Sequence, residues 1–105
     1  MTHYFLIDMM RIVSIAPSFI PSYTANSIQV VKASHALVQA GHQVTLLVPG
    51  ETRTAWAEIQ GQYGLRTPFS IQWVPENLRF RRYDFAFKAI QLGRGMDPDL
   101  IYTWM

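Results

Sequence analysis

The sequence of 105 residues contains no cysteine, which excludes a disulfide framework, thiolate catalysis and zinc sites built on cysteine. No apolar run approaches the roughly 18–20 residues that span a bilayer as a helix, so we do not expect an integral membrane protein. Nine basic residues against seven acidic ones give a formal net charge of only +2. This balance lacks the basic footprint of nucleic-acid binding, and no nucleic-acid partner is expected. A cytoplasmic protein fits, with peripheral membrane contact left open.

The N-terminal residues have neither a basic leader nor a small-residue cleavage site, and Asp8 interrupts their apolar stretch. These features argue against a signal peptide. A strand-like run begins directly after Met10. We therefore expect residues 1–9 to be a tail or an upstream extension, and residues 10–105 to form one folded unit, because a chain of this length holds a single core.

Short apolar runs rich in β-branched residues alternate with segments of helical spacing. The runs predict buried parallel strands at residues 11–17, 43–49, 70–75 and 99–104. A helix is expected after each of the first three strands, and each strand–helix–strand unit should be a right-handed crossover. The predicted fold class is α/β: an open parallel four-stranded Rossmann-like sheet of order 3-2-1-4 with flanking helices.

The predicted helices have defined ends and faces. Asn26 is the expected N-cap of the first helix, and Gly41 stands where a left-handed residue closes it. His35 falls on the polar side of this helix, whereas the residues expected to face the sheet are Val30, Ala33, Leu37 and Ala40. Two further helices are expected at residues 52–64 and 83–95, the latter with helical spacing through Phe87, Ile90 and Arg94. The large aromatic residues interpreted as core are Trp56, Trp73, Phe85 and Phe87.

The loop at residues 18–23 and the polar residues after it lie at the predicted switch point of the sheet, where ligands of such folds bind. A helix N-terminus there attracts anions. The loop contains no glycine, which excludes both the dinucleotide fingerprint and the Walker loop. Two roles fit Asn26 and Ser27: capping the helix, and contacting a phosphate, a sugar hydroxyl or a carboxylate.

The order of motifs resembles the start of a retaining glycosyltransferase of family 4, which has the GT-B fold. The matching stretches are "MRIVSIAP", a loop with Pro and Tyr, "ANSIQVVKASHALVQAGHQVTLLVP" and "PDLIYTW". The family often has paired glycines in the loop, and this chain resembles the subgroup with "ANS" instead. The resemblance runs from about Met10 to Trp104. It implies an incomplete GT-B N-terminal domain, truncated after the fourth strand.

The resemblance implies the acceptor-side portion of an enzyme that moves a sugar from a nucleotide-sugar donor to an acceptor. The nucleotide sugar is then a substrate, and no cofactor is expected. Thr24, Ala25, Asn26 and Ser27 match the loop whose backbone approaches the donor diphosphate and the acceptor. Trp104 replaces the family's usual Arg after "Y-T". The family's E-x7-E element belongs to the C-terminal domain, so no catalytic residue is assigned and the chain alone is expected to be inactive.

Other chemistry-bearing residues allow several roles. No histidine pair has metal-ligand spacing, so no metal site is expected, and His42 should bond to nearby backbone at the end of the sheet opposite the ligand crevice. Arg79, Arg81 and Arg82 lie among aromatic residues. They fit an anionic membrane surface, a phosphorylated acceptor or a solvated loop before the third helix.

Two other functions stay open. The fourth strand would be an exposed sheet edge, which could pair with a partner, most simply in a symmetric homodimer. The chain would then be a stand-alone α/β binding or dimerisation module without catalysis. It could also belong to a different nucleotide-sugar enzyme, such as an epimerase or dehydrogenase, against which the missing G-x-G-x-x-G counts.

Overall fold

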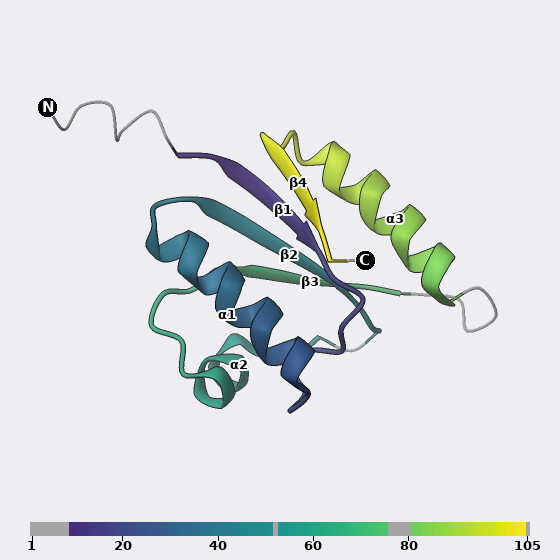
Figure 1. The fold of residues 1–105 in the computed structure, drawn as a ribbon. Helices are drawn as coiled ribbons and strands as arrows, with labels where there is room; N and C mark the ends of the chain where they lie inside the picture. Colours follow the sequence, from purple (N-terminus) through teal and green to yellow (C-terminus); the bar gives the residue numbers. More distant parts are fainter. Residues whose placement is uncertain (1–8, 52, 76–80, 105) are drawn as a thin grey trace, which may run out of the picture.

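The computed structural model describes residues 9–51, 53–75 and 81–104. Its elements are β1 (Arg11–Ile15), α1 (Ala25–Gln39), β2 (Gln43–Pro49), α2 (Trp56–Tyr63), β3 (Ser70–Val74), α3 (Arg81–Gly95) and β4 (Leu100–Thr103), as Figure 1 shows. The four described strands form one parallel sheet in the order β3-β2-β1-β4. The predicted α/β class and strand order are therefore confirmed. The expected tail at residues 1–9 falls almost entirely outside the described residues.

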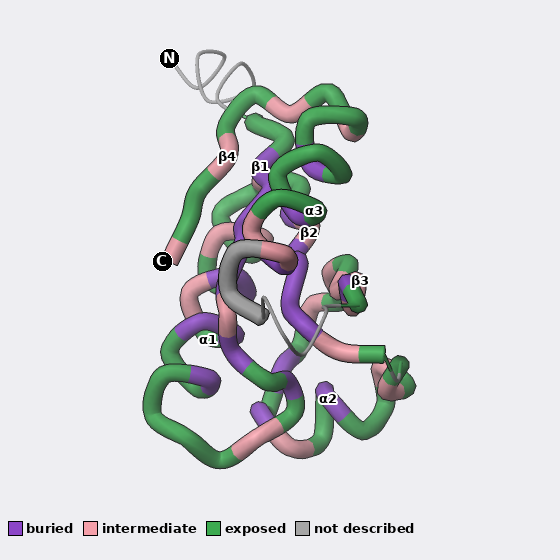
Figure 2. Tube along the Cα trace, turned by 90° about the vertical axis from the view of Figure 1, so that its right-hand side faces the viewer, coloured by how far each residue is buried: buried purple, intermediate pink, exposed green. Residues whose placement is uncertain are grey.

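Helices cover both faces of the sheet: α1 and α2 lie on one face and α3 on the other (Figures 1 and 2). The chain moves in one direction from β1 through β2 to β3 and then returns past β1 to β4. Because crossovers are right-handed, this reversal of direction places the third helix on the opposite face. The topological switch point of the sheet therefore lies between β1 and β4.

The core consists of two clusters separated by the sheet. Alternate side chains of β2 divide between them: Leu46 and Val48 pack under α1 and α2, whereas Leu47 packs under α3. The inner face of α3 presents Phe85, Ala89 and Gly93. A Cβ atom on Gly93 would lie 3.0 Å from Val13 Cγ1, so the glycine allows α3 to lie close on β1.

The start of α1 differs from the prediction. Thr24, not Asn26, is the N-cap: its backbone is extended, with φ −70 and ψ 149, and its Oγ1 accepts a hydrogen bond from Ser27 N at 3.2 Å. Asn26 is the second residue of the helix and donates from Nδ2 to Ser18 Oγ at 2.9 Å. Both residues are good caps. The loop geometry, which the sequence does not show, decides between them.

The buried face of α1 is also rotated from the predicted one. Of the predicted residues only Val30 is buried, Ala40 is exposed, and the buried residues are Ser27, Val30, Val31, Ser34 and His35. The polar members are satisfied locally, as when Ser34 Oγ donates to Val30 O at 2.9 Å. A pattern based on apolar residues misses buried polar residues that have partners.

His35 and His42, the histidines among the described residues, both form hydrogen bonds with backbone groups. His42 Nδ1 accepts from Met10 N at 3.1 Å, which confirms its predicted structural role. His35, predicted on the polar side, is only 7% exposed, and its Nε2 accepts from Arg66 N and Thr67 N, each at 3.1 Å. This prediction was wrong because the loop after α2 folds back over α1. Its two amides need an acceptor there.

The C-terminal end of α1 and the bounds of α3 can be compared with the predicted ones. Gly41 has φ +102, and His42 N donates to Leu37 O at 3.1 Å, which confirms the left-handed helix end as a Schellman motif. α3 begins at Arg81, two residues earlier than predicted. Phe87 is 64% exposed and Ile90 38%, so the predicted stripe faces outward and Phe87 is not a core residue. The contact face of α3 consists of Phe85, which was predicted as core, together with Ala89 and Gly93.

The remaining helix prediction was too long, since α2 begins only at Trp56. Trp56 and Trp73 pack against the core as expected. None of the helices in the described part of the chain combines the length and the apolar character that crossing a bilayer demands.

Candidate functional site

The candidate site lies at the carboxyl end of β1, where the chain leaves the sheet towards α1. β1 is flanked by β2 on one side and by β4 on the other, so the loop at residues 16–24 leaves the sheet at the switch point. Ligands of open α/β sheets bind at this position because the loops on either side separate there. Ser18, the first polar residue of the loop, is only 5% exposed.

A single hydroxyl group from α2 holds the middle of this loop. Tyr63 Oη donates to Ser22 O at 2.9 Å and accepts from Ser22 N at 2.9 Å. Ser27 Oγ lies 2.6 Å from the same oxygen. Ser27 Oγ also lies 3.4 Å from Ser22 O, to which it can donate, so either hydroxyl can be the donor in the contact between Ser27 and Tyr63. The Tyr63 hydroxyl is fully used by these contacts, and Gln62 Nε2 adds a further bond to Ser22 O at 3.0 Å.

Two more bonds hold the loop from other elements. Trp73 Nε1, on β3, donates to Ile20 O at 2.9 Å. Asn26 Nδ2, on α1, donates to Ser18 Oγ at 2.9 Å. The loop is thus tied to β3, α2 and α1, which gives it one shape without a ligand. Such preorganisation lowers the entropy cost of binding.

The residues that the resemblance assigns to the ligand divide between surface and interior. Thr24, Ala25 and Asn26 are exposed. Ser27 is fully buried, and its hydroxyl bonds inside the fold to Tyr63 Oη and Ser22 O, so its side chain does not face a ligand. Among the described residues the N–H groups of Ala25 and Asn26 have no hydrogen-bond partner, because the cap satisfies Ser27 N only. Free N–H groups in a first helical turn are the donors that bind anions.

The chemistry of this site is hydrogen bonding, not proton transfer. Residues 16–27 include no Asp, Glu, Lys, Arg or His. They supply hydroxyl groups, one carboxamide and the positive end of the α1 dipole. Asn26 uses Nδ2 internally, which leaves Oδ1 as an acceptor for a ligand hydroxyl. The arrangement can bind an anion or a polyol and can position it, but its side chains cannot act as a general acid or base.

Trp104, which follows β4, has an internal role. Its Nε1 donates to Ser14 Oγ at 3.0 Å, and Ser14 is only 3% exposed. The indole also meets Tyr102 edge to face, with ring centroids 5.4 Å apart. The polar atom of this side chain therefore bonds inside the fold, where it satisfies a buried hydroxyl.

The predicted arginine patch cannot be placed in full. Arg79 lies outside the described residues, and for Arg81 and Arg82 only the backbone is described, in the first turn of α3. Within the described ranges no group of three or more His, Cys, Asp or Glu side chains could hold a metal ion.

Sequence reasoning missed the residues that hold the loop. Tyr63, Gln62 and Trp73 are distant from it in the sequence, and only one signal was available: a buried Tyr or Trp needs a partner for its polar atom. That signal does not tell which backbone group the partner is.

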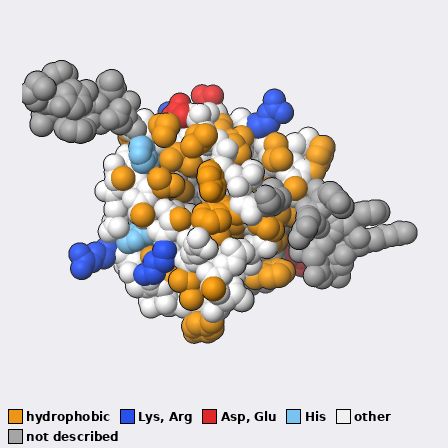
Figure 3. All heavy atoms as spheres, viewed as in Figure 1, with side chains coloured by type: hydrophobic (Ala, Val, Ile, Leu, Met, Phe, Trp, Pro, Cys, Tyr) orange, Lys and Arg blue, Asp and Glu red, His pale blue; other side chains and the backbone are white. Residues whose placement is uncertain are grey.

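The sequence predicted the exposed β4 edge but not the apolar groove of about 470 Å³ between α1 and β4. Its floor includes Leu100 and Tyr102, and its wall includes Ala33 and Leu37. Figure 3 shows hydrophobic side chains gathered on this face of the molecule. The predicted exposed edge at β4 is present, and the groove lies beside it.

Comparison of the chain with protein-family models, with curated proteins and with solved structures finds no significant match. The family 4 relationship thus stays a prediction that rests on the sequence motifs.

Proposed function

We propose that the chain is the N-terminal, acceptor-side portion of a glycosyltransferase that moves a sugar from a nucleotide-sugar donor to an acceptor. The observation that carries the proposal is the pair of free N–H groups on Ala25 and Asn26, held on a preformed loop at the switch point. A donor diphosphate is the anion that such groups and a helix dipole favour. The motif resemblance points independently to the same residues.

The role of this half would be to position substrates. In a transfer reaction the leaving diphosphate gains charge, and fixed donors aimed at that charge stabilise it without reorganisation. Ala25 N and Asn26 N are such donors, and Asn26 Oδ1 can accept a hydroxyl of the sugar or the acceptor. Since the loop offers no acid or base, the remaining chemistry would come from a C-terminal domain that completes the cleft.

The proposal extends to location. A cytoplasmic enzyme with a lipid-linked or phosphorylated acceptor would use Arg79, Arg81 and Arg82 as an anion-binding patch. Co-sedimentation with vesicles containing anionic lipid, compared with neutral vesicles, tests this part. Binding that is unchanged when all three arginines are replaced by glutamine would contradict it.

The sharpest test removes one N–H group and leaves the fold intact. Ala25 is the first residue of α1, where proline is favourable, and the extended backbone of Thr24 suits a residue before proline. We expect backbone amide shifts in the loop when UDP-glucose or GDP-mannose is titrated into the 105-residue chain. Ala25→Pro should weaken this binding by about 10- to 100-fold, since a hydrogen bond to a charged group contributes roughly 1.5–3 kcal/mol.

The matched control is Ala25→Gly, which keeps the N–H group and should bind like the unchanged protein. The free sugars without phosphate should bind far more weakly than the nucleotide sugars. Equal affinity of the proline and glycine variants, or shifts confined to residues away from the loop, would count against the proposal.

A second candidate function is a stand-alone binding or dimerisation module without catalysis. The free edge of β4 and the groove beside it favour this candidate. It predicts self-association and no response to nucleotide sugars, so the same titration separates the two functions.

A further inference from the structure

The edge of β4 is short, and its four residues carry none of the charges or prolines that protect many natural sheet edges. Among the described residues β4 pairs with β1 on one side and has no strand on the other. Its residues, Leu100–Thr103, include no charged residue and no proline. Charges, prolines and bulges are what normally prevent such an edge from pairing with another chain.

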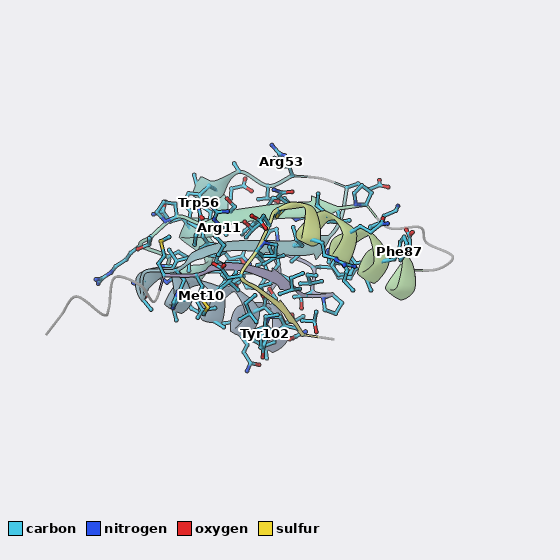
Figure 4. All side chains as sticks on the ribbon, turned by 90° about the horizontal axis from the view of Figure 1, so that it is seen from above. Met10, Arg11, Arg53, Trp56, Phe87 and Tyr102 are labelled. Atoms are coloured by element: carbon cyan, nitrogen blue, oxygen red, sulfur yellow. The ribbon has the colours of Figure 1, made fainter. Side chains whose placement is uncertain are left out.

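The opposite edge of the sheet differs. The residues that line a groove beside β3 include the segment 53–56, so part of the chain runs next to that strand. Figure 4 shows Arg53 and Trp56 on this side of the sheet, far from Tyr102. β3 also carries the polar residues Ser70 and Gln72. The two edges are thus unequal, and only β4 is both open and apolar.

We propose that two copies of this chain associate through antiparallel pairing of their β4 strands across a two-fold axis at Ile101. This inference deepens the second candidate function and rests on it, and self-association is measured separately from nucleotide-sugar binding. A two-fold contact is closed, because it uses the same patch on both copies and leaves no further site. The sheet would continue from one copy into the other.

The side-chain alternation of β4 selects the register. Leu100 and Tyr102 face the groove beside α1, whereas Ile101 packs in the core under α3. In an antiparallel pair, residues opposite each other point to the same face. With the axis at Ile101, Leu100 of each copy therefore lies opposite Tyr102 of the other.

This register covers the two exposed apolar residues of the strand. Leu100 is 44% exposed and Tyr102 50%, and each would gain an apolar neighbour from the second copy. Aliphatic–aromatic pairs across strands are among the favourable ones, at roughly 0.2–1 kcal/mol each. Asp99 would lie opposite Thr103, so no like charges meet. The strand is self-complementary, and this selects a second copy as the occupant over a charged or unrelated partner.

The contact is small, so the dimer should be weak and reversible. Four-residue strands alone bury less than the roughly 1,200 Å² of a standard stable interface. In sedimentation experiments the average mass should rise with concentration from the 12.1 kDa of one chain towards twice that value. A mass that stays at that of one chain at every concentration would overturn the proposal.

Two lysine substitutions locate the contact. Tyr102→Lys places a charge on the paired edge and should keep the protein monomeric. Phe87→Lys is the matched control, because Phe87 is an apolar residue 64% exposed on α3, away from β4. It should leave the concentration dependence unchanged. Loss of association in the Phe87 variant only would show that the contact lies elsewhere.

The absence of cysteine permits a test of the register that does not depend on Tyr102→Lys folding well. Opposite residues of an antiparallel pair have Cα atoms about 4.5–5.5 Å apart, within reach of a disulfide. When equal amounts of Leu100→Cys and Tyr102→Cys proteins are mixed and oxidised, the mixed disulfide should clearly exceed the share of about half that random pairing gives. Dominance of the Tyr102→Cys homodisulfide, or statistical amounts of all three, would overturn the pairing around Ile101.

Discussion

Substitution of Tyr63 by phenylalanine isolates the interaction that holds the candidate loop. The ring is 5% exposed and would stay in place, so only the hydroxyl is removed. This atom makes three hydrogen bonds, at 2.6, 2.9 and 2.9 Å, to Ser27 Oγ, Ser22 N and Ser22 O. Ser22 O keeps the bond from Gln62 and the buried Ser27 hydroxyl keeps a long bond of 3.4 Å to Ser22 O, whereas Ser22 N loses its partner.

A net hydrogen bond contributes about 0.5–1.5 kcal/mol, so one full loss and two partial losses should cost about 1.5 kcal/mol. For a domain of this size each kcal/mol shifts the melting temperature by about 4–8 °C, and a decrease of about 10 °C is expected. Urea unfolding followed by tryptophan fluorescence measures the same change, because Trp56 and Trp73 pack on this core.

The control is Tyr23→Phe, since Tyr23 is 85% exposed and its change should stay within about 0.5 kcal/mol. A double-mutant cycle of Tyr63→Phe with Ser27→Ala should give a coupling of about 1 kcal/mol. A cost below about 0.5 kcal/mol for Tyr63→Phe would refute the reasoning, because buried groups without partners would then carry no penalty.

Three further substitutions test other parts of the fold. Thr24→Ala removes the N-cap and should lower the free energy of unfolding by about 1 kcal/mol, measured by urea denaturation. His35→Ala leaves two backbone N–H groups without an acceptor and should cost about 2–4 kcal/mol, with faster amide exchange in the loop after α2. Gly61 occupies an open helical position, and Gly61→Ala should raise the free energy of unfolding by about 0.5–1 kcal/mol. Gly93→Ala should lower it, because the new Cβ atom would lie 3.0 Å from Val13. Equal melting temperatures of the two variants would contradict this contrast.

The fold class followed from the sequence because the central strands are buried on both faces. Continuous runs such as the one at Gln43–Pro49 are typical of parallel sheets, and its bounds were predicted correctly. The reversal that gives the order 3-2-1-4 is also what places the third helix on the other face. The spacing of apolar residues, the handedness of strand–helix–strand crossovers and the positions of glycines need no tertiary information, and together they were sufficient to predict the architecture.

Local signals failed where tertiary partners decide. His35 and Ser34 are polar in the sequence, yet both are buried because each finds a partner. Phe87 is apolar yet exposed, because the contact face of α3 runs through Phe85 and Ala89 and leaves Phe87 on another side of the helix. For the candidate site, sequence motifs indicated residues 24–27, but the hydrogen bonds from Tyr63 to Ser22 could not be predicted from the sequence alone.

The position of β1 has a consequence for how the chain folds. β1 pairs on one side with β2 and on the other with β4, and its contact with the segment before β4 spans 88 residues, as from Arg11 to Asp99. During synthesis one edge of β1 therefore stays open until β4 has emerged from the ribosome. Non-local parallel pairing of this kind slows folding and prolongs exposure to aggregation. The β1 edge is thus the part of the nascent sheet that is open to incorrect pairing for the longest time.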